Sequence, residues 1–229
     1  MKQKRYVLIF LCLAAAMLLL MAANVCIGSV NIPFAEVLRI LGGERGADVS
    51  ADIVLQIRLP RALAAAILGG ALALSGYLLQ TFFHNPIAGP FTLGISSGAK
   101  LTVALVMVFF LERALRVSSL VLILAAFVGA MISMSFVLLM SRVLNHMSTL
   151  IVSGVMIGYI CTAVTDFVVT FADESDIVNL HNWSQGSFSG ISWDNVAVMT
   201  VVIFLTSAFV FLLSKPISAY QLGEAYAQN

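Results

Sequence analysis

Long apolar stretches without a charged side chain dominate the pattern of this chain. A helix needs about 20 apolar residues to cross a ~30 Å hydrocarbon core, and in lipid it satisfies its own backbone hydrogen bonds. The stretch 62–99 is too long for one span, and His84-Asn85-Pro86 and Gly89-Pro90 interrupt it with turn signals. We therefore predict an all-α polytopic membrane protein with about six transmembrane helices. The predicted spans are 6–27, 62–83, 91–111, 117–140, 149–172 and 195–214.

The composition supports a membrane protein. Hydrophobic residues make up 61% of the 229 residues and charged residues 10%, whereas a soluble domain has roughly 45–50% and about 25%. A disordered chain is excluded by this apolar content, and three scattered cysteines do not fit a secreted disulfide scaffold. The net charge of +1 gives no reason to expect a nucleic-acid partner.

The first predicted span follows a basic N-terminus, Met1 to Arg5. Its apolar run is longer than the ~7–15 residues of a signal peptide, so we expect it to be retained. The basic N-terminus is expected in the cytoplasm, although the Lys and Arg residues of the later loops do not add support. This topology places 28–61, 112–116 and 173–194 outside, and 84–90, 141–148 and the C-terminal tail inside.

No motif predicts enzyme chemistry or a bound cofactor. The segment from Gly94 to Lys100 lacks the spacing of a phosphate-binding loop, so ATP use is assigned to another chain. The three histidines fall on separate predicted loops, which predicts no shared metal site. The acidic cluster Asp173, Glu174 and Asp176 lacks EF-hand spacing, and a solvated helix end accounts for it better.

Two charged residues fall inside predicted spans, where charges are costly and often functional. Lys100 and Asp166 lie ~12 Å apart in depth at 1.5 Å per helical residue, so a direct salt bridge is not expected. Asp166 either lines a polar pathway near the outer face or reaches the outer interface. Lys100 is expected to snorkel or to face water inside the bundle.

Small residues at four-residue spacing predict close helix packing. The pairs Gly94/Gly98 and Gly154/Gly158 are both GxxxG motifs. They fit either contacts within one bundle or a dimer or gating interface.

Several motifs resemble the FecCD/BtuC-like permeases, the membrane subunits of ABC importers for iron–siderophore complexes, haem and cobalamin. The match runs in order along the chain and extends to its C-terminus. The motifs are Arg58-Leu-Pro-Arg61, Gly69-Gly-Ala-Leu-Ala-Leu-Ser-Gly76, Asn85-Pro-Ile-Ala88, Leu93-Gly-Ile-Ser-Ser-Gly98, Trp183…Trp193-Asp194 and Leu222-Gly-Glu-Ala-Tyr-Ala227.

The resemblance implies a permease subunit of an iron–siderophore importer in the cell membrane, with its N-terminus inside, working by alternating access powered by a separate ATPase subunit. A cobalamin or haem permease of the same family, and a truncated non-transporting membrane interaction subunit, remain alternatives. Family permeases have ten spans, dimerise with an identical or different permease subunit, and receive substrate from an external binding protein. Residues 1–229 are then a single permease domain that stops after span six.

The resemblance also assigns roles to individual residues. Arg58 and Arg61 are expected to dock the binding protein, and Leu222, Gly223, Glu224 and Ala225 to begin the helix that couples to the ATPase. Pro60 between the arginines is expected at a helix start, where its missing amide proton costs no hydrogen bond.

Overall fold

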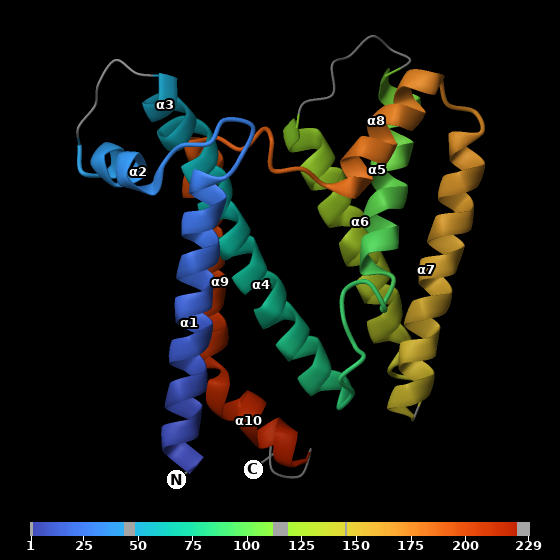
Figure 1. Ribbon diagram of the computed structural model, residues 1–229. Helices are drawn as coiled ribbons and strands as arrows, with labels where there is room; N and C mark the ends of the chain where they lie inside the picture. The colour runs from blue at the N-terminus through green and yellow to red at the C-terminus, as the bar shows by residue number, and fades with distance from the viewer. Residues whose placement is uncertain (1, 44–48, 112–118, 145, 224–229) are drawn as a thin grey trace. The chain divides into compact units, whose positions relative to one another are not determined.

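The computed structural model describes residues 2–43, 49–111, 119–144 and 146–223, and within them every regular element is a helix (Figure 1). In these described ranges, five helical stretches are long and apolar enough to cross a membrane, and a shorter apolar helix covers the remaining predicted span. The predicted all-α polytopic fold is therefore confirmed. The elements are α1 (Lys2–Cys26), α2 (Phe34–Leu41), α3 (Val49–Asp52), the π-helix η1 (Ile53–Arg58), α4 (Leu59–Phe83), α5 (Ile95–Leu111), α6 (Ser119–Met140), α7 (Met147–Val169), α8 (Glu174–Gln185), α9 (Trp193–Leu212) and α10 (Ser214–Leu222).

The chain divides into two compact units. The first comprises Met1–Ala71 and Phe188–Ser207, and the second comprises Leu72–Ser187 and Ala208–Asn229. The core of the first unit joins the end of α1, the loop after it, α2 and the stretch from α3 to the start of α4. Its buried members are Val25, Ile32, Val37, Ile40, Ala51, Val54 and Ala62.

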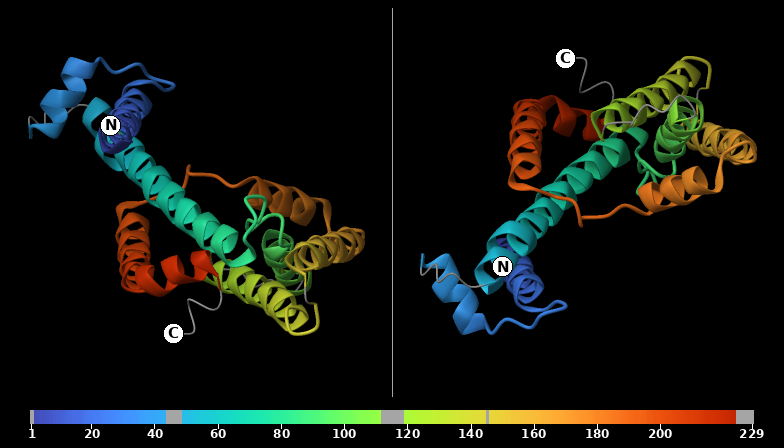
Figure 2. Two further views of the ribbon diagram at one scale, coloured as in Figure 1. Left: turned by 90° about the horizontal axis from the view of Figure 1, so that it is seen from below. Right: turned by 90° about the horizontal axis from the view of Figure 1, so that it is seen from above.

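In the second unit α5, α6 and α7 lie side by side (Figure 2). Leu93 and Leu150 belong to one core cluster of this unit. In a second cluster Leu180 of α8 packs against Val103 and Met107 of α5. Helices α5, α6 and α7 therefore form a three-helix bundle, and α8 packs on α5.

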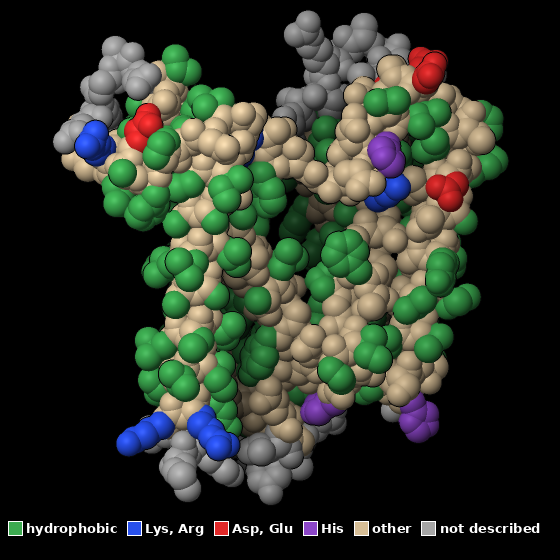
Figure 3. Space-filling model, viewed as in Figure 1, with side chains coloured by type: hydrophobic (Ala, Val, Ile, Leu, Met, Phe, Trp, Pro, Cys, Tyr) green, Lys and Arg blue, Asp and Glu red, His purple; other side chains and the backbone are tan. Residues whose placement is uncertain are grey.

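Apolar side chains face outward along the long helices. None of the most apolar window of α1 is buried within the protein, and Leu19 and Leu20 are each 71% exposed. Hydrophobic side chains cover the sides of the helices in Figure 3, and Lys and Arg side chains lie at the N-terminal end of α1. A soluble monomer rarely exposes so large an apolar surface, so this surface is typical of a membrane protein.

The helix that leads into α4 begins earlier than predicted, and Pro60 is not at its start. Helical structure is continuous from Val49 to Phe83 and passes through the π-helix η1. The amide of Leu59 donates to the carbonyl of Val54, five residues earlier. Proline has no amide proton and its ring collides with the carbonyl four residues before it, and a wider turn accommodates both effects.

Two short helices outside the spans were predicted as loops. These are α2 and α8. Helix α8 accounts for the acidic cluster, because Asp173 lies at its N-cap position, without a side-chain capping hydrogen bond, and Glu174 and Asp176 lie in its first turn. Negative charge is favourable at a helix N-terminus. The acidic residues thus lie at a helix end, as expected, but it is the start of a helix that was not predicted, and Asp176 is buried rather than solvated.

The predicted turn between the second and third spans is present and extends further along the chain than expected. The Asn85 side chain accepts a hydrogen bond from the amide of Ile87 at 2.9 Å, and Gly94 has a φ of +71°. This left-handed conformation favours glycine. Helix α5 therefore begins at Ile95 rather than at 91.

Candidate functional site

Arg58, at the end of η1, binds the C-terminal end of α1. Its Nη1 donates to the carbonyls of Val25 and Cys26 at 2.8 and 3.0 Å, and its Nη2 donates to that of Val30. The side chain is only 8% exposed. The last carbonyls of a helix have no partner within it and carry partial negative charge, so a guanidinium satisfies both needs.

Gly28 allows this approach. A Cβ atom at this position would lie 2.7 Å from Nη2 of Arg58. Any larger residue would therefore displace the guanidinium or the loop. We use the name arginine clamp for Arg58 together with the segment from Val25 to Val30.

Arg61, three residues further on, contacts a different segment of the first unit. Its Nη2 donates to the carbonyl of Ser189 at 2.7 Å. Nearby, the indole of Trp193 donates to the carbonyl of Leu55 at 2.9 Å. Two hydrogen bonds thus fasten the segment before α9 to the η1–α4 junction, although these residues lie more than a hundred positions apart in the sequence.

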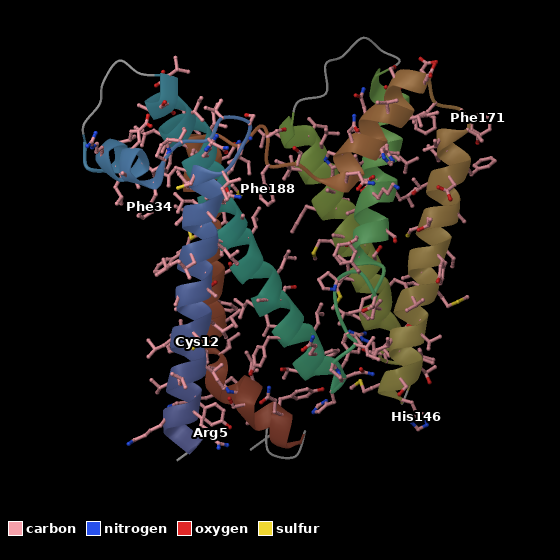
Figure 4. All side chains as sticks on the ribbon, viewed as in Figure 1. Arg5, Cys12, Phe34, His146, Phe171 and Phe188 are labelled. Atoms are coloured by element: carbon pink, nitrogen blue, oxygen red, sulfur yellow. The ribbon has the colours of Figure 1, made fainter. Side chains whose placement is uncertain are left out.

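A hollow of about 660 Å³ lies beside the two arginines. The Nε atom of Arg61 is buried and has no hydrogen-bond partner among the described residues. Phe188, which also lines the hollow, is labelled in Figure 4 on the segment before α9. The lining residues are Asn24, Ile27, Gly28, Ser29, Ile53, Ile57, Arg58, Arg61, Ala65 and Phe188.

The two predicted docking residues thus lie at one place but differ in what they contact. Arg58 is buried and its guanidinium is occupied by three backbone carbonyls. Arg61 is half-buried and makes one hydrogen bond through its guanidinium. Their docking role stays a prediction, and Arg61 has the larger unused capacity to donate hydrogen bonds.

The predicted ATPase-coupling segment is only partly described. Leu222 is the last residue of α10, and Gly223 follows with a φ of +127°. Glu224 and Ala225 lie outside the described residues. The two residues before this segment, Tyr220 and Gln221, both contact the end of α4.

The two predicted intramembrane charges lie on different helices of the second unit. Lys100 is half-buried in α5 and Asp166 is exposed on α7. Because Asp166 lies on the exposed side of its helix, its side chain is not enclosed by the described residues. Its role in a pathway stays a prediction.

The predicted packing glycines make close contacts within the second unit. A Cβ at Gly94 would lie 2.7 Å from both the carbonyl oxygen of Gly154 and the nitrogen of Gly158, so the start of α5 touches α7 backbone to backbone. A Cβ at Gly98 would meet Ser133 and Gly129 of α6. The four glycines therefore bring α5 against both of its neighbours.

The described residues hold no cluster of three or more His, Cys, Asp or Glu that could bind a metal. Cys12, Cys26 and Cys161 are all free. Sequence reasoning missed Gly28 and Trp193 as partners of the arginine region. The only signal for Trp193 was its place in the family motif, and none pointed to Gly28.

The helices and their apolar surface define a polytopic helical membrane protein. Residues 13–229 match the FecCD transport family, and the chain belongs to this family. The resemblance seen in the sequence is thereby confirmed.

Curated relatives and a solved structure agree with the assignment. The vitamin B12 import system permease protein BtuC of Escherichia coli O127:H6 is 33% identical over 230 residues, which cover 100% of this chain and 66% of the relative. BtuC of Klebsiella pneumoniae is 34% identical over 219 residues, covering 95% and 62%. The inward-facing structure of a proposed metal-chelate type ABC transporter shares 25% identity with a TM-score of 0.76, covering 96% of this chain and 66% of that chain. The chain thus spans about two thirds of the length of the curated relatives it matches.

Proposed function

We propose that the chain is the membrane-spanning permease part of an ABC importer for a metal chelate. The observation that carries the proposal is the family match over residues 13–229, which includes nearly every described element. Substrate crosses by alternating access, driven by a separate ATPase subunit. The chain itself is a transporter component rather than an enzyme.

Three cargo classes are in question. The curated relatives are named for vitamin B12 import, which supports a cobalamin permease. The sequence motifs predicted an iron–siderophore permease, with a haem permease as a further family alternative. All three cargoes are large organic chelates of a metal ion, and no described residue distinguishes between them.

The partners follow from the same proposal. A second permease subunit completes the dimer, and an ATPase subunit contacts 222–225 on the cytoplasmic side, where the N-terminus also lies. The exposed apolar sides of α1 and the other spans contact lipid. An external binding protein delivers the cargo to the surface around Arg61.

The contacts of Arg58 and Arg61 support different roles for the two residues in docking. Guanidinium stays charged, pairs with two carboxylate oxygens and is weakly hydrated, so Arg61 is suited to acidic residues of a binding protein. Arg58 supports this surface from inside, because the arginine clamp fixes the loop beside it.

Uptake by the complete transporter that contains this chain tests the proposal. Cells that express it with its ATPase and binding protein should accumulate radiolabelled cobalamin or a labelled ferric siderophore, and a variant ATPase unable to hydrolyse ATP should abolish accumulation. Competition with unlabelled cobalamin, ferric siderophore and haem identifies the cargo class. If no chelate accumulates while the subunits assemble normally, the chain is a non-transporting membrane subunit.

A further inference from the structure

Gln221 of α10 joins two successive turns of α4 in the second unit. Its Nε2 atom donates to the hydroxyl oxygens of Tyr77 and Thr81, each at 3.0 Å. Tyr77 and Thr81 are four residues apart and therefore lie on one face of the helix. A single amide group thus holds α10 against that face.

Tyr220, the preceding residue, binds the last turn of α4. Its hydroxyl donates to the carbonyl of Phe82 at 3.3 Å, and this carbonyl belongs to the last turn of α4, where carbonyls lack partners within the helix. Its ring stacks on Phe82 with centroids 6.2 Å apart and planes at 9°, and it lies 5.1 Å from the ring of His84. The contact combines a hydrogen bond with two aromatic interactions.

An apolar surface lies beside these polar contacts. Leu78 and Phe82 of α4 and Pro216 and Ile217 of α10 line one shared groove together with Leu213, Thr81 and Tyr220. We use the name inner clasp for Tyr220 and Gln221 with their partners Tyr77, Thr81, Phe82 and His84.

We propose that Tyr220 and Gln221 are positioning residues that make α10 and the last two turns of α4 move as one body during transport. The inference rests on the proposed function, in which the segment 222–225 directly after the inner clasp contacts the ATPase. The segment 222–225 begins directly after Gln221, so no flexible linker separates it from the inner clasp. A displacement of this segment is therefore transmitted to α4.

Replacing Gln221 should impair the coupling of ATP hydrolysis to substrate uptake without impairing the folding of the chain. Without Gln221, Thr81 can bond to a carbonyl of its own helix, as threonine hydroxyls in helices commonly do, so α4 remains intact. In the complete transporter, Gln221→Ala should leave assembly and ATP hydrolysis unchanged. It should lower substrate taken up per ATP by about fivefold, the effect of one net hydrogen bond.

Gln80 provides a matched control. It is a glutamine like Gln221, it lies next to Thr81 on α4, and its side chain is exposed. Gln80→Ala should leave uptake per ATP unchanged. Equal ratios for Gln221→Ala and the wild type would overturn the inference. Absence of uptake in the wild type would instead contradict the proposed function, so the two failures are distinguishable.

A crosslink gives a second measurement that does not depend on the alanine variant. In a background without Cys12, Cys26 and Cys161, Tyr77→Cys and Gln221→Cys together remove the hydrogen bonds of Gln221, and a short bis-maleimide replaces them covalently. The unlinked double variant should be poorly coupled, and crosslinking should restore uptake per ATP. An inactive crosslinked transporter would show that α10 and α4 must separate, which contradicts the inference.

Discussion

Arg58 shows how one side chain can organise a surface without facing it. Its guanidinium makes three hydrogen bonds to backbone carbonyls at the end of α1 and in the following loop. The family resemblance singled out Arg58 together with Arg61. The sequence could not predict the burial of Arg58, because the π-helix that ends at Arg58 changes the direction in which each side chain points.

The arginine clamp should contribute measurably to stability. Arg58→Ala leaves three carbonyls without their charged donor, and hydrogen bonds to charged groups are worth about 1.5–3 kcal/mol each, so a net loss of about 2 kcal/mol or more is expected. Arg58→Lys should recover only part of it, since an ammonium group does not reproduce the planar fork. Thermal unfolding in detergent measures both.

Arg61→Ala serves as the control for the clamp, because this side chain is less buried and donates one hydrogen bond among the described residues, to Ser189. It should cost less than Arg58→Ala. An Arg58→Ala protein as stable as Arg61→Ala would contradict the assigned role of the clamp.

Gly94 gives a second prediction about the stability effect of a single residue. Alanine there must adopt a φ of +71° and place its Cβ 2.7 Å from the backbone of α7. Left-handed backbone costs an L-residue about 1–2 kcal/mol and overpacking about 1–3 kcal/mol. Gly94→Ala should therefore lower the free energy of unfolding by about 3 kcal/mol.

The control for Gly94 is Gly70→Ala in α4, where a Cβ meets nothing within 4 Å. This change should be neutral or slightly stabilising, since alanine favours helix over glycine by about 1 kcal/mol. Similar unfolding temperatures for the two variants would contradict the close α5–α7 contact.

At the scale of elements, the spans were predictable and the short helices were not. Apolar runs such as that of α6 identify a spanning helix by length and the absence of charge alone. Helices α2 and α8 are short and mixed in polarity, so their formation depends on packing, as Leu180 of α8 against α5 illustrates. The inner clasp could not be predicted from the sequence either, because it joins residues about 140 positions apart.

The element α10 carries the next prediction. It ends at Leu222, and the segment after it is proposed to contact the ATPase. A cysteine in place of Ala225, in a cysteine-free background, should react with membrane-impermeant maleimide only from the cytoplasmic side and should crosslink to the ATPase subunit. Reaction from outside would contradict both the contact and the proposed orientation.

At the scale of the whole molecule, apolar patterning and family motifs were enough to assign the class, but not the cargo. Composition and charge-free stretches reflect the solvent in which the chain folds. In the proposed importer, cargo recognition depends on the dimer and the complete pathway, and this chain spans about two thirds of the length of its curated relatives. Neither the hydropathy of the chain nor the spacing of its motifs therefore identifies the cargo.

In the proposed function, docking of the binding protein is a property of the complete importer. Arg61→Glu should weaken it at least tenfold, because a favourable charge pair worth more than about 1.5 kcal/mol becomes repulsive, and raised salt should weaken wild-type docking through screening. Surface plasmon resonance on transporter in nanodiscs measures both. A compensating acidic-to-basic change on the binding protein should partly restore affinity, whereas unchanged binding by Arg61→Glu would exclude a docking role.

The chemistry of the arginine clamp also determines how freely the neighbouring loop can diverge. Arg58 recognises main-chain oxygens of Val25, Cys26 and Val30 rather than their side chains. Substitutions at these positions preserve the acceptors, although Val25 is also part of the buried core, whereas a Cβ at Gly28 would force the Arg58 guanidinium or the loop to shift. The exposed positions of the loop are therefore a suitable site for engineering, where epitopes or altered partner preferences can be introduced while Gly28 is kept.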